Sequence, residues 1–166
     1  EEKDTFQKVQ DILSFVYSQR DSYLADPEFE KVNQQKLLDL KYLIKQFDNF
    51  QKKENVKNSY SSRNHFNSTS HFSIYDTFGN NVTMTSSIES AFGSRLFVDG
   101  FLLNNQLTDF SFKQKSNNKL IKNRVVGGKK PLSSMSPIII LDKNKNFLFS
   151  VGSPGGIAII SYVFKT

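Results

Sequence analysis

The first third of the chain has apolar residues spaced three and four positions apart, a pattern typical of amphipathic helices. One apolar stripe predicts a helix over residues 4–20, and a second set of apolar positions predicts another helix between Leu37 and Phe47. Asp26-Pro27 interrupts the chain between them, because proline lacks the N–H group that a helix interior needs. The first stripe consists of Phe6, Val9, Ile12, Leu13 and Val16.

Between residues 54 and 68 the composition changes to asparagine, serine, lysine and arginine without periodicity. Such a segment is typical of an exposed linker, where processing concentrates. Beyond it, alternating positions predict strands, with Gly79-Asn80 as a turn. A late apolar run over 157–164 predicts a helix, so the whole order indicates an α+β fold. The strand candidates are residues 71–76, 82–88, 95–98, 101–103, 138–141 and 147–151.

Composition narrows the possible chemistry. The 166 residues carry a net charge of +6, two histidines and no cysteine. Without cysteine there is no disulfide or thiolate catalysis, and two histidines disfavour a multi-histidine metal centre, so we expect neither a metal nor a cofactor. The lysines are scattered, and the basic segment 113–130 is expected to be a solvated loop rather than a nucleic-acid interface. No stretch reaches the roughly 20 apolar residues that span a bilayer.

Thr69 follows the linker directly and opens the first predicted strand. A threonine hydroxyl is a weak nucleophile unless a base lies beside it, and a threonine that begins a chain can use its own α-amine as that base. Cleavage of a precursor before Thr69 would expose this group. A purely structural threonine at the start of a strand has the same pattern.

Three more clusters allow a chemical and a structural interpretation. Adjacent Gly155 and Gly156 before a helix can aim two N–H groups at one oxygen, as an oxyanion hole does, or can form an ordinary turn. The serines between Pro131 and Pro137 can bind a carboxylate or belong to a loop. The polar cluster 104–109 can hold an ammonium group or form a turn.

The order of these blocks resembles the small subunit of the gamma-glutamyltranspeptidase family, and Arg20-Asp-Ser-Tyr-Leu-Ala-Asp-Pro-Glu-Phe29 resembles the end of its large subunit. The resemblance implies that residues 1–53 are the helical C-terminal part of the large subunit. Residues 54–68 would then be a processing linker, and 69–166 the N-terminal part of the catalytic subunit. The blocks are Thr-x-His, Gly-Asn before a hydroxyl-rich strand, Phe-Gly-Ser, Leu-Asn-Asn-Gln-x-x-Asp-Phe-Ser, Lys-Pro-Leu-Ser-Ser-Met-Ser-Pro and Gly-Ser-Pro-Gly-Gly.

The resemblance further implies an N-terminal-nucleophile hydrolase, built as an αββα sandwich of which this chain is a part. Its precursor would cut itself between Ser68 and Thr69. Thr69 would then attack a γ-glutamyl amide such as glutathione, and the resulting ester would pass to water or to an amino-acid or peptide acceptor. The family also implies a periplasmic or secreted protein whose partners are the remainder of both subunits, with no nucleic acid and no membrane span in this segment.

Each matching position takes a role from the resemblance. Ser87 would orient Thr69, while Gly155 and Gly156 would supply the oxyanion N–H groups. Separate pairs would bind the α-carboxylate and the α-ammonium group of the substrate; these are Ser133 with Ser134, and Gln106 with Asp109.

The chain departs from the family in ways that keep two alternatives open. Glu89 stands where better-known members have asparagine, and it could pair with the substrate ammonium or change which donors are accepted. Thr108 replaces a common aspartate, Ile157 replaces a usual serine, and no residue matches the arginine that clamps the substrate carboxylate. The alternatives are a related acylase acting on another amide and a catalytically silent fragment with a structural or binding role.

Overall fold

The computed structural model describes residues 2–53 and 69–166, so the predicted linker and Ser68 lie outside the described residues. The chain divides into two compact units. The first combines Glu1–Arg63 with Phe110–Leu132, and the second combines Asn64–Asp109 with Ser133–Thr166. Each unit therefore contains segments that are far apart in the sequence.

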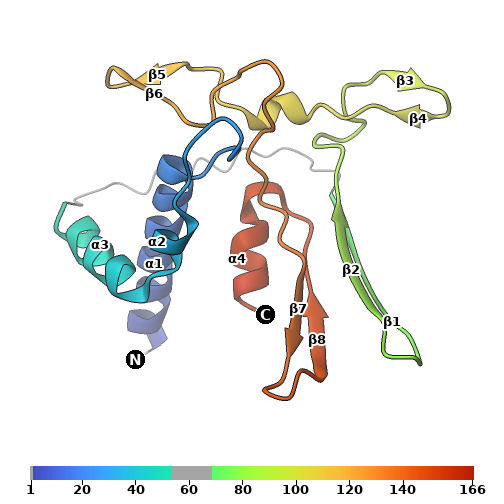
Figure 1. The fold of residues 1–166 in the computed structure, drawn as a ribbon, viewed down its shortest axis with the longest axis horizontal. Helices are drawn as coiled ribbons and strands as arrows, with labels where there is room; N and C mark the ends of the chain where they lie inside the picture. The colour runs from blue at the N-terminus through green and yellow to red at the C-terminus, as the bar shows by residue number, and fades with distance from the viewer. Residues whose placement is uncertain (1, 54–68) are drawn as a thin grey trace. The chain divides into compact units, whose positions relative to one another are not determined.

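The described residues of the first unit form three helices (Figure 1), which are α1 Glu2–Tyr23, α2 Gln34–Leu38 and α3 Leu40–Lys53. The first predicted helix is confirmed. The second predicted helix is wrong in one respect, because it is divided at Asp39, whose backbone is extended (φ −79°, ψ 107°). The Asp39 carboxylate accepts the N–H groups of Lys41 and Tyr42 at 2.9 and 3.2 Å and so begins α3 as an N-cap.

Phe15 forms the apolar centre of this helical group. Its side chain is buried, and its ring meets those of Phe47 and Phe50 edge to face at centroid distances of 5.4 and 5.5 Å. The stripe on α1 is thereby packed against α3, as the apolar spacing of both helices predicts.

The second unit is built mainly from two antiparallel hairpins, β1–β2 and β7–β8 (Figure 1). The strand positions predicted from alternation are confirmed, although several strands are shorter than expected. The bounds are β1 Ser70–Tyr75, β2 Asn81–Ser86, β3 Phe97–Val98, β4 Phe101–Leu102, β7 Ile138–Leu141 and β8 Phe147–Val151.

The turns of both long hairpins are stabilised in the same way, by an aspartate that accepts hydrogen bonds from an asparagine four residues later. The Asp76 carboxylate accepts the backbone N–H of Asn80 at 2.8 Å and its side-chain amide at 2.8 Å. Asp142 does the same with Asn146, at 2.8 and 2.9 Å. A carboxylate that satisfies several donors in one tight loop fixes the turn, and the turn fixes the strand register.

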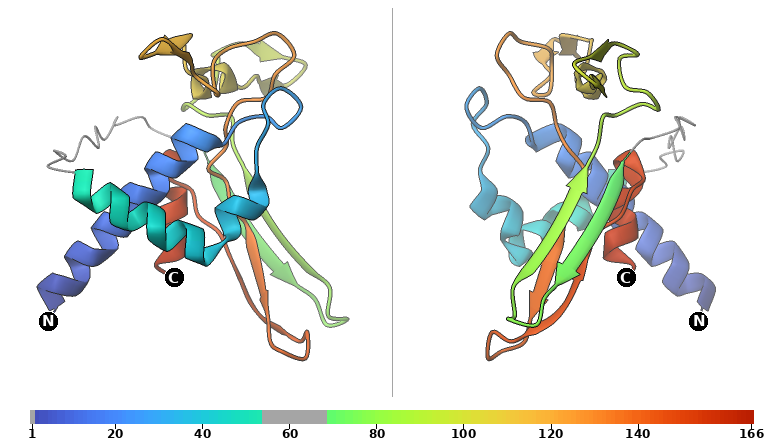
Figure 2. Two further views of the ribbon diagram at one scale, coloured as in Figure 1. Left: turned by 60° about the vertical axis from the view of Figure 1, so that its left-hand side comes forward. Right: turned by 90° about the vertical axis from the view of Figure 1, so that its right-hand side faces the viewer.

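The two hairpins lie side by side (Figure 2). On a polar face of β1–β2, Tyr75 stacks on Phe147 with ring centroids 4.6 Å apart, and the Asn81 amide lies 3.5 Å from the Ser150 hydroxyl. The opposite face of β1–β2 is apolar and exposed. It consists of Phe72, Ile74, Val82 and Met84, which are 44–58% exposed.

The late apolar run is helical, as expected. A 3₁₀ turn, η2 Gly156–Ala158, leads into α4 Ile159–Phe164, and Ile159 is fully buried. The mixed helix-and-strand content of the predicted α+β fold is confirmed, whereas a complete αββα sandwich is more than these residues show. None of the helices within residues 2–53 and 69–166 is both long and apolar enough to cross a bilayer.

The expectation that 113–130 is a simple solvated loop is wrong. The segment contains a small hairpin, β5 Lys115–Ser116 and β6 Lys119–Leu120, joined by Asn117 and Asn118 with φ angles of 49° and 60°. Asparagine tolerates this left-handed conformation and is common in such two-residue turns. Further along, the Lys129 side chain is completely buried, because carboxylate and carbonyl oxygens of the first unit surround its ammonium group.

Asp142→Asn is expected to lower the melting temperature of the protein at pH 7, and this difference is expected to shrink as pH falls below about 4. Hydrogen bonds from the Asn146 amide and backbone hold the pKa of the Asp142 carboxyl below its usual value. The hairpin is therefore stabilised above the unfolded-state pKa, and this contribution is lost as pH falls through the lower folded-state pKa.

Melting curves of both proteins between pH 7 and pH 3 measure the effect, with exposed Asp48→Asn on α3 as the control. A stability difference that stays constant across this range would contradict the role given to the charged carboxylate.

Candidate functional site

The Thr69 hydroxyl lies directly before β1 and donates a hydrogen bond to the Ser87 hydroxyl at 3.1 Å. Hairpin register explains the pairing. Ser70 is opposite Ser86, so the next residue on each strand, Thr69 and Ser87, also meet. Two residues that are 18 positions apart in the sequence thus form one pair of hydroxyls.

Ser87 links this pair to Glu89, whose N–H donates to the Ser87 hydroxyl at 3.0 Å. Glu89 has a φ of 73°, a left-handed conformation that is uncommon for a residue with a side chain and tends to occur at functional sites. The Thr108 hydroxyl lies 3.4 Å from the Glu89 carboxylate. A path of contacts therefore runs from Thr69 through Ser87 and Glu89 to the polar cluster 104–109.

Asn105 attaches that cluster to the loop after β2. Its side-chain oxygen accepts the Ser90 N–H at 2.9 Å, and its amide donates to the Ser90 hydroxyl at 3.0 Å. The 3₁₀ helix η1 Gln106–Asp109 follows at once, so its polar side chains are positioned beside Glu89.

Within η1, the Gln106 amide donates to the Asp109 carboxylate at 2.9 Å. Among the described residues, the Gln106 side-chain oxygen is a buried acceptor that has no hydrogen-bond partner. Buried acceptors are nearly always satisfied, so a bare amide oxygen next to a carboxylate is chemically suited to a ligand that donates hydrogen bonds, such as an ammonium group.

The glycine pair adopts backbone conformations that favour glycine. Gly155 has φ 137° and Gly156 has φ 57°. A β-carbon on Gly155 would lie 2.6 Å from the Tyr162 ring of α4, so the close packing of this helix on the turn also excludes a side chain there.

The same loop begins beside β1, the strand that follows Thr69. A β-carbon on Gly152 would lie only 2.2 Å from the His71 ring, which shows how closely the end of β8 approaches β1. His71 is held in place by hydroxyls, with Nδ1 2.9 Å from Thr85 and Nε2 3.2 Å from Ser73. The imidazole therefore packs between β1 and the glycine loop.

The serine pair belongs to the same compact unit as Thr69. The Ser133 hydroxyl accepts the Met135 N–H at 3.1 Å, which fixes a turn within the segment before β7. Within residues 69–166, the hydrogen bond of the Thr69 side chain goes to Ser87 and not to the serine pair or the glycine pair.

Sequence reasoning gave no individual role to His71 or Gly152, and it named Asn105 only as a member of the polar cluster 104–109. A signal for a polar inner face was present in the sequence. His71 and Ser73 occupy alternate positions of β1, and the hydroxyl residues of β2 occupy alternate positions of the next strand. The contacts of Gly152 and Asn105 cross between separate elements, so no spacing in the sequence reveals them. Within 2–53 and 69–166, no group of three or more histidine, aspartate or glutamate side chains converges to hold a metal ion.

Comparison with known proteins identifies the family to which this chain belongs. The profile of the family described as Gamma-glutamyltranspeptidase matches residues 1–166. The chain belongs to the gamma-glutamyltranspeptidase family. A protein named glutathione hydrolase proenzyme from Escherichia coli strain K12 is 35% identical over 174 aligned residues, which cover 98% of this chain. The protein of that name from Bacillus subtilis strain 168 is 34% identical over 97% of the chain.

A solved structure of a threonine-to-alanine mutant of Helicobacter pylori gamma-glutamyltranspeptidase is also similar. It superposes with a TM-score of 0.50 and 44% identity, covering 57% of this chain and 54% of the other. The chain spans about 30% of the length of the E. coli and B. subtilis proteins. The family profile therefore matches the whole chain, whereas the chain corresponds to less than a third of the E. coli and B. subtilis proteins.

The contact between Gly152 and His71 is testable by a double-mutant cycle. Gly152→Ala alone is expected to destabilise the protein by about 1–3 kcal/mol, because its new methyl group overlaps the imidazole. In a His71→Ala background the same substitution is expected to cost less than about 0.5 kcal/mol.

Chemical unfolding of the four proteins gives the coupling energy. Gly127→Ala is the control, since a β-carbon at Gly127 meets nothing within 4 Å. Equal costs of Gly152→Ala in the two backgrounds would show that the ring and the glycine do not meet.

Proposed function

We propose that the protein containing this chain is a gamma-glutamyltranspeptidase with glutathione hydrolase activity, made as a precursor that cuts itself between Ser68 and Thr69. The observation that carries the proposal is the hydroxyl pair of Thr69 and Ser87 at the start of β1, immediately after the predicted linker. The family membership and the names of the relatives support the same chemistry.

In the proposed self-cleavage, Thr69 Oγ1 attacks the carbonyl carbon of Ser68. The bond to the Thr69 nitrogen breaks, and the nitrogen takes the proton that the attacking hydroxyl gives up, so that it becomes a free α-amine. Water then hydrolyses the ester left between Ser68 and Thr69. The products are a chain ending at Ser68 and a chain beginning at Thr69, whose amine now lies on the same residue as its hydroxyl.

In the proposed turnover, that α-amine removes the hydroxyl proton as Thr69 attacks the γ-carbonyl of the donor. The Ser87 hydroxyl, 3.1 Å away, holds the Thr69 side chain in one rotamer for the attack. The N–H groups of Gly155 and Gly156 stabilise the oxyanion. The leaving amine takes the proton, and the γ-glutamyl ester passes to water or to an amino-acid or peptide acceptor.

The proposed recognition of the donor uses groups of opposite charge. Gln106 and Asp109 bind the α-ammonium group, which supplies the donors that the buried Gln106 oxygen lacks. Glu89 adds a second carboxylate beside them through its contact with Thr108. Ser133 and Ser134 donate hydroxyl hydrogen bonds to the α-carboxylate.

The rest of the protein completes this proposal. Residues 1–53 are taken as the end of the large subunit, 54–68 as the linker and 69–166 as the start of the small subunit. The exposed apolar face of β1–β2 fits a further layer of an αββα sandwich, because such a face is normally covered. We also propose, from the family, that the protein is periplasmic or secreted.

Glu89 favours one second candidate, an acylase of the same family that acts on a different amide. A carboxylate replaces a neutral asparagine next to the proposed ammonium site, and this changes the charge that a donor meets. For this candidate Glu89 is not an ammonium ligand, and the enzyme acts on donors that lack an α-ammonium group.

Thr69→Ala is expected to leave the full-length precursor as one band on a denaturing gel, while the unmodified protein gives two. It is also expected to lower hydrolysis of a γ-glutamyl anilide by at least 1,000-fold, because the substitution removes the hydroxyl that is proposed to attack the donor. Two bands from Thr69→Ala, or one band from the unmodified protein, would contradict the proposed cleavage.

Glu89→Gln is expected to raise KM for a γ-glutamyl anilide by about ten- to a hundred-fold, because a charge-assisted contact to the ammonium group contributes about 1.5–3 kcal/mol. KM for the corresponding glutaryl anilide, which lacks the ammonium group, is expected to stay within two-fold. Steady-state kinetics with both donors distinguish the candidates, since an acylase acting on other amides would favour the glutaryl donor before any mutation.

A further inference from the structure

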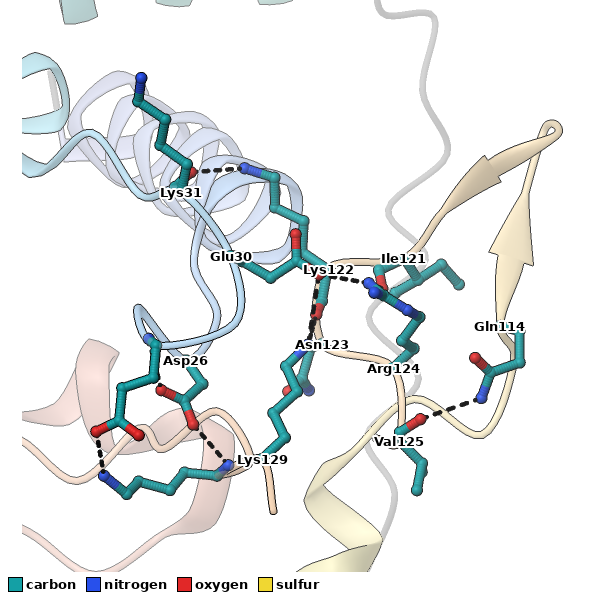
Figure 3. Close-up of polar contacts among 12 residues, drawn as sticks. Asp26, Glu30, Lys31, Gln114, Ile121, Lys122, Asn123, Arg124, Val125 and Lys129 are labelled. Atoms are coloured by element: carbon teal, nitrogen blue, oxygen red, sulfur yellow. Dashed lines mark hydrogen bonds and ion pairs between the residues drawn. The ribbon is translucent and has the colours of Figure 1, made fainter. Parts of the chain in front are cut away.

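Residues on the two sides of the proposed cleavage point meet in the first compact unit. Residues 26–31 follow α1, and residues 122–130 follow the β5–β6 hairpin, yet both belong to that unit. Figure 3 shows their side chains pointing toward each other from the two segments. If the chain is cut before Thr69, these contacts become contacts between two polypeptides.

Glu30 is the acidic centre of the contact (Figure 3). Arg124 donates a hydrogen bond to its carboxylate, and the Lys129 ammonium group lies 3.6 Å from the same oxygen. The Lys129 side chain is fully buried, and its ammonium group also donates to the Lys122 carbonyl oxygen. A buried cation without its anion is strongly unfavourable, so Lys129 depends on Glu30 across the proposed cut.

Asp26 provides a second link of the same kind. Its buried carboxylate accepts the Lys130 backbone N–H at 2.8 Å and the Glu28 backbone N–H at 3.1 Å. The hydrogen bond from Lys130 holds the pKa of the Asp26 carboxyl below its usual value, and the hydrogen bond from Arg124 does the same for Glu30. Both acids therefore stay charged at neutral pH, as a latch of ion pairs requires.

We propose that Asp26 and Glu30 on one side, with Arg124, Lys129 and the Lys130 amide on the other, form an ionic latch that holds the two polypeptides together after cleavage. The inference rests on the proposed self-cleavage and adds the residues that keep its products joined. The partner of each segment is the other cleavage product of the same chain. The latch is complete while the linker is intact, so cleavage does not have to build it.

The chain offers a matched control two residues from Glu30. Glu28 and Lys130 also form an ion pair across the proposed cut, at 3.2 Å, but their side chains are 68% and 73% exposed. Exposed pairs contribute little because water and salt screen them. Glu28→Gln and Glu30→Gln thus make the same chemical change in one loop, and burial is what distinguishes them.

The test uses the full-length protein with Thr69→Ala and a site-specific protease sequence placed within residues 54–68. Cutting is then independent of self-cleavage, so a failure of the proposed function leaves this experiment unaffected. After cutting, the two pieces carry different dyes, and loss of energy transfer in moderate urea gives their rate of separation.

Glu30→Gln is expected to separate at least ten times faster than the unmodified cut protein, and Glu28→Gln less than three times faster. Equal rates for the two variants would overturn the latch. Circular dichroism of the uncut variants shows whether each one folds.

A second measurement needs no mutation in the latch. A carbodiimide joins a carboxylate to an adjacent amine as an amide, and the carbodiimide leaves as a urea. In the cut protein it is expected to join Glu28 to Lys130, and mass spectrometry identifies the linked peptides. If Glu30→Gln does not fold, the presence or absence of the Glu28–Lys130 link in the cut protein tests the latch instead. Absence of the Glu28–Lys130 link from the cut protein would show that the two segments do not stay together.

Discussion

The register of the β1–β2 hairpin is the constraint on which the candidate site depends. Ser70 opposite Ser86 brings Thr69 to Ser87, and Ser87 in turn fixes the backbone of Glu89. A slip of one residue would turn every side chain of one strand to the other face and separate the two hydroxyls. The Asp76 turn prevents this slip, since its carboxylate binds the backbone and side chain of Asn80 at once.

The second hairpin gives this register a surface to pack against. It has the same aspartate–asparagine turn, and its strand β8 runs past Tyr75 and His71 on the polar face of the first hairpin. Glycine at position 152 permits the close approach, and glycine at position 155 permits α4 to pack on the following turn. The glycine loop is therefore positioned by packing, while Thr69 is positioned by hydrogen bonds.

The order of segments along the chain does not follow the compact units, and this has a consequence for the proposed cleavage. Residues 110–132 lie beyond the proposed cleavage point but belong to the same unit as the N-terminal helices. The contact is buried and charged, with Lys129 inside it. Such contacts tolerate the loss of a distant covalent bond, because their stability comes from local partners and from the exclusion of water.

The sequence by itself determined the elements and the family. Apolar spacing located α1, the main strands and the late helix, because periodicity reports directly which face of an element is buried. The order of the short motifs located Thr69 and the residues around it. Asp39 shows the limit of the method, since a capping side chain divided what the apolar pattern presented as one helix.

Only the tertiary structure decided which of these residues meet. The buried acceptor on Gln106, the packing of His71 on Gly152 and the burial of Lys129 all arise between elements that are distant in sequence. A basic segment has the same composition whether it is solvated or folded over a carboxylate. Burial depends on what lies opposite a side chain in space, and the order of residues along the chain does not contain that information.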